Sequence, residues 1–144
     1  MGHSGISIRR ARVDDELSVK SLARSLATTF SIEDDAFKRL FNQIIDNDDA
    51  RILVSTNELG AINGYLLGFV YDAFFANGTV AWIEEMYVID TARRNGIGLA
   101  LEREFEAWAR ERDSKLIALA TRRADSFYSA VGYEESAVYF RRIL

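Results

Sequence analysis

The stretch that decides the fold is Arg93-Arg94-Asn95-Gly96-Ile97-Gly98, because it lies between a strand pattern and a helix pattern. Residues 82–89, just before it, are rich in β-branched and aromatic side chains, as strands are. Just after it, apolar side chains recur at the spacing of one buried helix face, at Ile97, Leu101, Phe105 and Trp108. Two glycines and two arginines therefore lie where a strand turns into a helix.

A glycine-rich turn at the start of a helix is suited to binding an anion. The first N–H groups of a helix have no partner within it, and the helix dipole is positive at this end. Glycine lets a ligand approach the backbone closely, and arginine forms bidentate hydrogen bonds with phosphate oxygens. Residues 93–98 therefore suit the pyrophosphate of a nucleotide-bearing cofactor, although a tight turn with solvated arginines would contain the same residues.

Two other nucleotide-binding motifs are missing from the chain. A P-loop ends in Gly-Lys-Ser/Thr, and no such run occurs. The dinucleotide fingerprint has a third glycine three residues after the second, where this chain has Leu101. The sequence therefore favours a different nucleotide-bearing ligand, one with several phosphates.

A second motif follows a short apolar run at 116–120 that predicts a buried strand. It consists of Thr121, Ala124, Phe127-Tyr128 and Gly132-Tyr133. Together, the two segments resemble the GNAT superfamily of acyl-CoA-dependent N-acetyltransferases. That family's phosphate loop is Arg/Gln-x-x-Gly-x-Gly/Ala, and its later motif is Asn-x-x-Ala-x-x-Phe-Tyr-x-x-x-Gly-Phe/Tyr. Thr121 stands where the family usually has Asn, which weakens one expected side-chain hydrogen bond.

The composition limits the chemistry that the chain can perform. Its 144 residues predict a single domain with a real core, here a GNAT domain over 1–144. The chain has no cysteine, which excludes disulfides, thiolate nucleophiles and thiolate metal sites. The only histidine, His3, lies in Met1–Gly5, a segment that we expect to be disordered or left over from recombinant expression. We therefore expect neither a histidine base nor a metal site.

The charge and hydropathy of the chain indicate its partners and location. A net charge of −4 argues against nucleic acid as a ligand and favours cationic partners. The sequence has no apolar run long enough to span a bilayer and no signal-peptide pattern, so we expect no membrane association and a cytoplasmic location. A homodimer is the expected assembly.

The pattern of apolar residues predicts an α/β (α+β) fold. Strands are expected at 6–9, 51–56, 64–75, 79–89 and 116–120, with a final strand pair within 133–144; helices are expected after Asp15, from Ser31 to Asp46, after Gly96 and around Tyr128. Asn77-Gly78 predicts a hairpin. The order β-α-α-β-β-β-α-β-α-β-β is that of the GNAT fold, a mixed, mostly antiparallel sheet of about seven strands with about four helices.

Acyl transfer to an amine requires a group that accepts the proton of the amine. An alkyl amine has a pKa of about 10 and is mostly charged at neutral pH, so a carboxylate can both attract it and deprotonate it. Glu84 and Glu85 lie where related acetyltransferases have acceptor-binding acids. Their side chains should point to opposite faces of the strand unless a bulge intervenes, and the family commonly has one here. The resemblance favours Glu84 as the catalytic group; ordinary solvated glutamates are the alternative.

Tyr128 is the candidate general acid. A phenol with a pKa of about 10 is protonated at neutral pH and can donate a proton to a leaving thiolate with a pKa of about 8.5. The tyrosine at this position of the family motif usually has that role. A buried core tyrosine would give the same sequence pattern.

The resemblance implies acetyl-CoA as the acyl donor. It assigns the donor site to three segments, namely the end of the strand, the glycine-rich loop and part of the second motif. These are Met86, Tyr87, Val88, Arg93, Arg94, Asn95, Gly96, Ile97, Gly98, Leu99, Thr121 and Phe127. Residues 86–88 would pair with pantetheine amides as an added strand would, and a freed N–H near Met86 could polarise the thioester carbonyl. Arg122 and Arg123 are further candidates for the adenosine phosphate or are ordinary surface arginines.

The acceptor is expected to be a small cationic amine. Phe30 lies in an acidic and aromatic stretch between the first two predicted helices, and we assign it to the acceptor site together with Glu84 and Glu85. The acid pair within 83–88 is similar to that of polyamine and small-amine acetyltransferases. Two alternatives stay open: acetylation of a protein N-terminus or lysine, and an acyl-CoA-binding sensor domain without catalysis.

Overall fold

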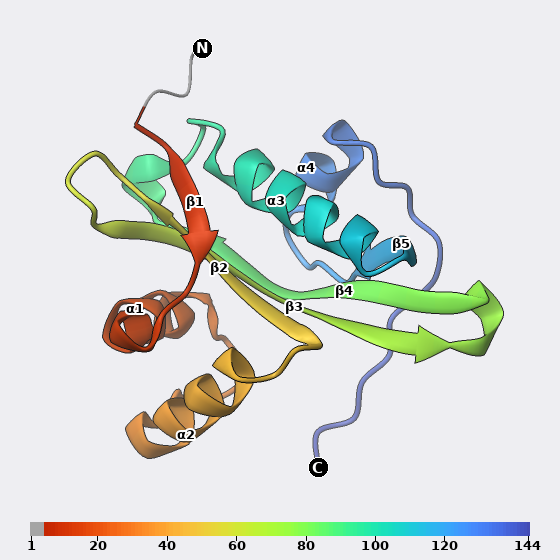
Figure 1. Ribbon diagram of the computed structural model, residues 1–144, viewed down its shortest axis with the longest axis horizontal. Helices are drawn as coiled ribbons and strands as arrows, with labels where there is room; N and C mark the ends of the chain where they lie inside the picture. Colours follow the sequence, from red (N-terminus) through yellow and green to blue (C-terminus); the bar gives the residue numbers. More distant parts are fainter. Residues whose placement is uncertain (1–4) are drawn as a thin grey trace.

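The computed structural model describes residues 5–144 (Figure 1). Its elements are β1 (Ser7–Arg10), α1 (Glu16–Leu26), α2 (Asp34–Ile45), β2 (Ala50–Thr56), β3 (Ile62–Ala73), β4 (Gly78–Val88), α3 (Ile97–Glu111), β5 (Ser114–Leu119) and α4 (Asp125–Ala130), with three short 3-10 turns. Of the segment expected to be disordered or left over from expression, residues 1–4 lie outside the described part, and Gly5 is an exposed turn residue.

The strands form one mixed sheet in the order β1-β2-β3-β4-β5. The first three pairings are antiparallel, whereas β4 and β5 run parallel. A parallel pair needs a crossover connection, and α3 supplies it between β4 and β5. The predicted mixed, mostly antiparallel sheet is therefore confirmed.

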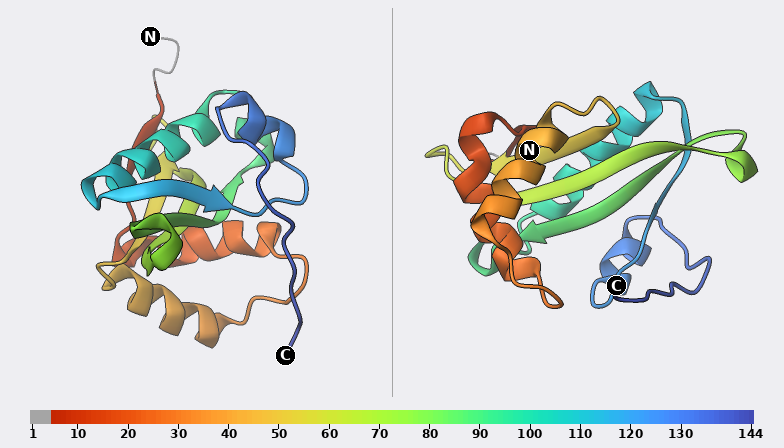
Figure 2. Two further views of the ribbon diagram at one scale, coloured as in Figure 1. Left: turned by 90° about the vertical axis from the view of Figure 1, so that its right-hand side faces the viewer. Right: turned by 90° about the horizontal axis from the view of Figure 1, so that it is seen from below.

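The helices cover the two faces of the sheet (Figures 1 and 2). One core cluster lies under α3 and contains Leu66, Leu101 and Phe105, each fully buried. The other lies under α1 and α2 and contains Val54 and Tyr65, which are also buried. The site described below lies at one end of this three-layered arrangement, beside the start of α3.

Two sequence expectations about element boundaries are wrong. The second helix begins at Asp34 with Glu33 as its N-cap, so Ser31 does not cap it. The final strand pair is also missing, and the sheet has five strands instead of about seven. Residues 133–144 contain no glycine, asparagine or proline for a tight turn, and twelve residues are few for two strands and a loop.

The C-terminal residues instead run in an irregular path past the end of β5 toward the loop between α1 and α2 (Figure 2). The Arg141 guanidinium donates to the Thr29 hydroxyl there, at 3.0 Å. Several apolar side chains of this segment are exposed, among them Tyr139 and Phe140. The C-terminal segment therefore passes the end of β5 and reaches the α1–α2 loop without adding a strand to the sheet.

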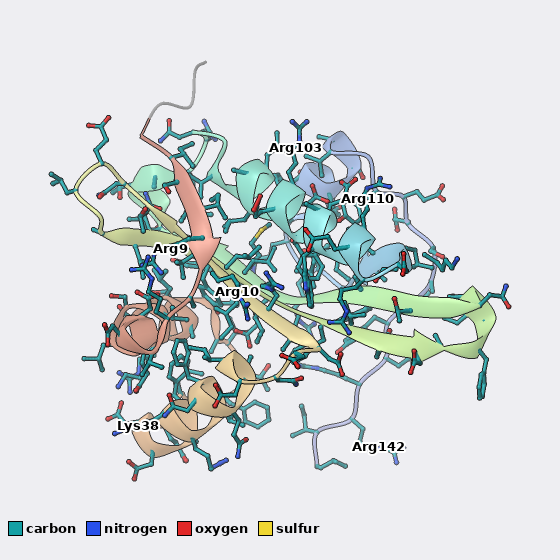
Figure 3. The ribbon with its side chains drawn as sticks, in the orientation of Figure 1. Arg9, Arg10, Lys38, Arg103, Arg110 and Arg142 are labelled. Atoms are coloured by element: carbon teal, nitrogen blue, oxygen red, sulfur yellow. The ribbon has the colours of Figure 1, made fainter. Side chains whose placement is uncertain are left out.

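Charged side chains are spread over the surface. The basic side chains labelled in Figure 3 come from four separate parts of the chain: Arg9 and Arg10 on β1, Lys38 on α2, Arg103 and Arg110 on α3, and Arg142 near the C-terminus. Arg9 and Arg110 are each paired with a carboxylate, at 2.7 Å. None of the helices described over residues 5–144 is long and apolar enough to cross a membrane. That the protein does not bind nucleic acid stays a prediction.

Candidate active site

The two parallel strands separate halfway along β4. The pairing between β4 and β5 runs from Thr79↔Ser114 to Ile83↔Leu119. Beyond Ile83, residues 84–88 of β4 pair with β3 only, so the β5-facing side of this segment has no strand partner in the described chain. Met86, Tyr87 and Val88, the residues expected to contact pantetheine, all lie on this unpaired edge. An extended ligand with amide groups could pair with it as a further strand would.

A β-bulge lies in β4 at the point of separation. Leu67 pairs with Glu85 whereas the next residue, Gly68, pairs with Ile83, so Glu84 is an extra residue in β4. An extra residue shifts the alternation of side chains by one position. Both acidic side chains therefore lie on the face that α1 and α2 cover. Glu85 contacts Tyr65 of that core. Glu84 contacts Trp82, whose neighbours Ala81 and Ile83 belong to the core on the α3 side, so Trp82 points to the opposite face.

The two glutamates have different surroundings. Glu85 is half-buried and accepts a hydrogen bond from the Tyr65 hydroxyl at 2.7 Å. Burial raises the pKa of Glu85 and the nearby Glu84 charge adds to this effect, whereas the hydrogen bond from Tyr65 lowers the pKa. Glu84 is exposed, and its carboxylate accepts from the Trp82 indole N–H at 3.0 Å. The pKa of Glu85 is thus raised from its ordinary value toward neutral pH.

The start of α3 has the features of an anion site. Gly96 is the N-cap with a φ of 83°, a left-handed conformation that favours glycine, and no side chain caps the helix. The first N–H groups of α3, from Ile97 to Leu99, have no partner within the helix. A Cβ built on Gly98 would lie 3.3 Å from the Phe127 ring and 3.9 Å from the Met86 side chain. Gly98 therefore lies at the junction of α3, α4 and the unpaired edge of β4.

Arg93 is engaged with its own loop. Its Nε donates to the Val88 carbonyl at 2.8 Å, its Nη1 pairs with Asp90 at 2.7 Å, and its guanidinium lies over the Tyr87 ring. These contacts brace the connection between β4 and α3. Arg94 is exposed in a left-handed conformation, with a φ of 67°, and the Asn95 amide donates to the Ala92 carbonyl. Arg93 and Asn95 are thus held by contacts within the loop, whereas the exposed Arg94 is available to a ligand.

The second motif forms α4 and its two ends. Thr121, which replaces the family's usual Asn, accepts from the Ala124 N–H at 3.0 Å and shapes the turn before the helix. Phe127 faces Gly98, and Tyr128 is 8% exposed. Burial and the nearby Glu102 charge raise the pKa of Tyr128 to about 12. Arg122 and Arg123 are exposed on the loop that leads from β5 to α4.

Glu102 is a buried group that the sequence motifs did not single out. It lies on α3, is 4% exposed, and accepts from the Tyr133 hydroxyl at 2.7 Å. Its place on the buried face was readable from the sequence, because it follows Leu101 and lies one turn before Phe105. A carboxylate on the buried face of a helix indicates a buried polar contact. Its partner, Tyr133, is remote in sequence and could not be inferred.

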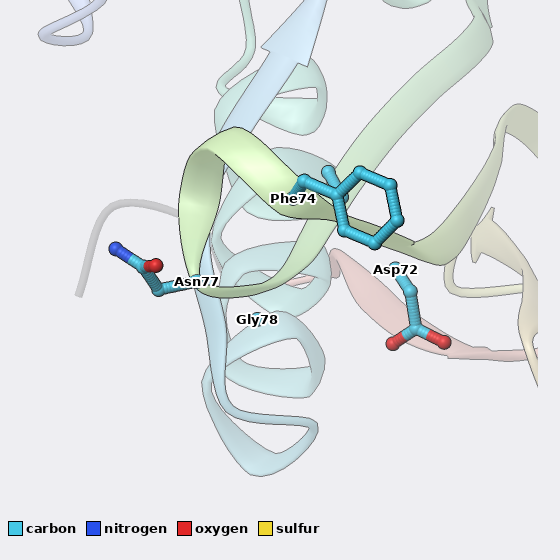
Figure 4. Close-up of a pocket in the computed structure, with 5 residues that line it drawn as sticks. Asp72, Phe74, Asn77 and Gly78 are labelled. Carbon is cyan, nitrogen blue, oxygen red and sulfur yellow. The ribbon is translucent and has the colours of Figure 1, made fainter.

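Among the hollows on the surface of residues 5–144, two are compared with the expected site. One, of about 420 Å³, lies at the loop between α1 and α2 and is lined by Arg24, Ala27, Thr28, Thr29, Phe30, Ser31 and Ile32. It contains Phe30, the expected acceptor residue, which is 66% exposed. The other, of about 490 Å³, lies at the tip of the β3–β4 hairpin around Phe74 and Asn77 (Figure 4), at the opposite end of the hairpin from the bulge. Only the first lies on the expected acceptor side.

The family model of the GNAT acetyltransferases matches residues 19–133, most of the chain. The chain belongs to this acetyltransferase family. Its members are acyltransferases, so the match also confirms the enzyme class. Within residues 5–144, no group of three or more histidine, cysteine or acidic side chains is arranged to hold a metal ion.

Relatives of known name agree with this membership. Aminoglycoside N(6')-acetyltransferase type 1 of Klebsiella aerogenes is 36% identical over 87 residues, which make up 54% of this chain and 57% of that protein. The chain thus matches little more than half the length of this curated relative.

Solved structures show the same fold. Glucosamine-6-phosphate N-acetyltransferase from Arabidopsis thaliana has a TM-score of 0.85 at 22% identity, over 96% of this chain and 97% of that one. An aminoglycoside acetyltransferase from an uncultured soil metagenomic sample, solved with trehalose, has a TM-score of 0.79 at 21% identity, over 96% of each chain.

Proposed function

We propose that this protein transfers the acetyl group of acetyl-CoA to a primary amine by direct attack in a ternary complex. The observation that carries the proposal is the separation of β4 from β5 beside the uncapped start of α3. This arrangement offers an unpaired strand edge for the pantetheine amides and free N–H groups for the pyrophosphate. Gly98 keeps the approach to these N–H groups open, and Arg94 supplies an exposed guanidinium.

Acetyl-CoA would supply the activated acetyl thioester, and the chain would supply the proton transfers. The sequence favours Glu84 as the group that accepts the amine proton. The surroundings of Glu85 instead support Glu85 in that role. Burial raises the Glu85 pKa toward the range in which a base works at neutral pH. Exposed Glu84 is then suited to attract the cationic acceptor. Tyr128, with its pKa raised to about 12, stays protonated and can donate to the leaving thiolate.

A small cationic amine is the acceptor that we propose. The bulge presents two carboxylates on one face, the face that also carries the α1–α2 loop with Phe30. Asp34 in the same region is already neutralised by Lys20 and Arg24, at 2.8 and 2.6 Å. The name of the Klebsiella aerogenes relative makes aminoglycosides, which carry several amino groups, the first compounds to test.

A panel of amines with acetyl-CoA, followed by the release of free thiol, tests the proposal. The panel contains an aminoglycoside, a polyamine, an amino sugar, a peptide with a free N-terminus and a lysine peptide. We expect thiol release with small cationic amines and not with the peptides. Acetylation of the peptides alone would make this a protein acetyltransferase. Stabilisation by acetyl-CoA without transfer to any amine would favour a sensor domain.

The cytoplasmic location and the homodimer stay predictions. Gel filtration with light scattering measures the assembly directly, and the exposed apolar side chains of residues 138–144 make that measurement informative.

A further inference from the structure

We propose that Glu102 and Tyr133 form a latch that fixes α4 against α3 and so positions the hydroxyl of Tyr128. The inference rests on the proposed function, in which Tyr128 donates a proton. Neither Glu102 nor Tyr133 is assigned a contact with the substrates; each is a positioning residue that acts through Tyr128.

The first step is that α4 depends on contacts outside itself. It has only six residues, and a helix so short is not stable alone. Phe127 packs where Gly98 leaves room, and Tyr128 faces inward. Beyond these apolar contacts, the Tyr133 hydroxyl donates to Glu102 at 2.7 Å and ties the end of α4 to the middle of α3.

The second step is that Tyr133 is coupled to Tyr128 by the backbone. Gly132 has a φ of 105°, and the Gly132 N–H donates to the Ser129 carbonyl while the Tyr133 N–H donates to the Tyr128 carbonyl, at 3.2 and 2.9 Å. These are the bonds of a Schellman C-cap, in which the residue after glycine packs on the helix residue five positions earlier. The two rings meet edge to face with centroids 5.5 Å apart.

The third step concerns why a carboxylate occupies this position. A buried carboxylate is seldom more stabilising than an apolar side chain of similar volume, so stability alone does not explain Glu102. Among the described residues, the ionisable groups that face Glu102 are Arg103 and Glu106 of its own helix, Tyr128 on α4, and Tyr133, its hydrogen-bond partner. Its single buried hydrogen bond goes to the segment that carries the proposed acid. Fixing the direction of α4 is therefore the role that the contact supports.

Kinetics of four variants test the latch. Tyr133→Phe removes the hydroxyl and keeps the ring packing, whereas Glu102→Leu removes the acceptor and keeps the volume. We expect each to lower kcat about tenfold, because a misplacement of about 1 Å costs up to about 10²-fold, while KM for acetyl-CoA changes less than about twofold. Glu102→Gln, whose amide oxygen still accepts, should recover most of the loss. The double variant Glu102→Leu/Tyr133→Phe should be no slower than either single variant.

Matched control variants and the melting temperature distinguish a loss of positioning from a loss of stability. Glu104→Leu on the exposed side of α3 and Tyr71→Phe on β3 are the controls. We expect Glu102→Leu to melt no lower than wild type while its kcat falls, which loss of stability alone would not produce. Tyr128→Phe measured alongside tests the proton donor itself.

The outcomes are distinguishable. If Tyr128→Phe is impaired and Tyr133→Phe keeps wild-type kcat, the latch is wrong and the proposed function stands. If the wild type transfers no acetyl group, the proposed function fails. In that case, hydrogen exchange of the backbone amides of residues 125–130 tests whether the latch holds α4. Faster exchange in Tyr133→Phe than in the wild type supports the latch, and unchanged exchange overturns it.

Discussion

Tyr65→Phe tests the role of Glu85, because it removes the hydroxyl that donates to the Glu85 carboxylate and keeps the ring. Burial raises the pKa of Glu85, and this hydrogen bond opposes the effect by favouring the ionised form. Without the hydroxyl, the pKa of Glu85 rises further. The proposed proton acceptor is then ionised only at higher pH, so the acidic limb of kcat/KM moves to higher pH.

The size of the shift follows from the geometry of the hydrogen bond. The oxygens are 2.7 Å apart and Tyr65 is 1% exposed, so bulk water does not readily replace the lost donor. A hydrogen bond to an ionised group contributes about 1.5–3 kcal/mol, and one pKa unit corresponds to about 1.4 kcal/mol. We therefore expect the acidic limb to move up by about one to two pH units.

The same variant should have a pH-dependent stability. The folded-state pKa of Glu85 lies above its unfolded value, so ionisation of Glu85 removes stability as the pH rises from the unfolded pKa through the folded pKa. Losing the Tyr65 hydroxyl increases that cost. The melting temperatures of variant and wild type should differ least near about pH 4, where Glu85 is protonated, and most near about pH 8.

The assay is the pH dependence of kcat/KM between about pH 5 and pH 9, with the acceptor that the amine panel identifies. Tyr71→Phe, a half-exposed tyrosine on the same strand, is the matched control and should leave the profile unchanged. An acidic limb in Tyr65→Phe that coincides with that of the wild type would refute Glu85 as the proton acceptor and return the role to Glu84.

Four further substitutions test the remaining parts of the site. Gly98→Val places two extra methyl groups where a Cβ alone would already lie 3.3 Å from Phe127; the rise in melting temperature on adding acetyl-CoA should disappear, whereas a retained shift would contradict the donor site. Tyr128→Phe should lower kcat by about 10²-fold with unchanged affinity for acetyl-CoA, and a wild-type kcat with chemistry rate-limiting would exclude Tyr128 as the acid. Glu84→Gln should raise KM for a cationic amine while Glu85→Gln should lower kcat, and wild-type kinetics in both would direct the search to larger, protein acceptors.

Local patterns predicted most of the fold. Each helix and each of the five strands was expected near its observed position, because apolar periodicity and the turn residues Asn77, Gly96 and Gly132 agree with the tertiary structure. The two failures share a cause. A helix start at Ser31 and a strand pair within residues 133–144 both rest on short polar or apolar patterns, without the glycine or asparagine that would fix a backbone conformation.

The chemistry of the site was less predictable than its location. The motifs assigned Gly98 and Phe127 to the donor site and Tyr128 to proton donation, and the structure brings these three residues close together. The motifs could not show which of Glu84 and Glu85 is buried, since that depends on the register with β3. Glu102 and Tyr133 meet only through the fold, thirty-one positions apart in sequence.

One structural feature links the acidic pair to the start of α3. A Cβ on Gly68 would lie 2.3 Å from the Phe105 ring, so the absence of a side chain there lets α3 pack directly on β3. Gly68 is also where the register with β4 shifts, which leaves Glu84 as the extra residue. The helix whose N-terminus is proposed to bind pyrophosphate is therefore seated on the bulge that brings both carboxylates to one face. The close packing of α3 and the bulge thus meet at Gly68, so the proposed donor and acceptor sides share one rigid part of the sheet, as direct transfer between two bound substrates requires.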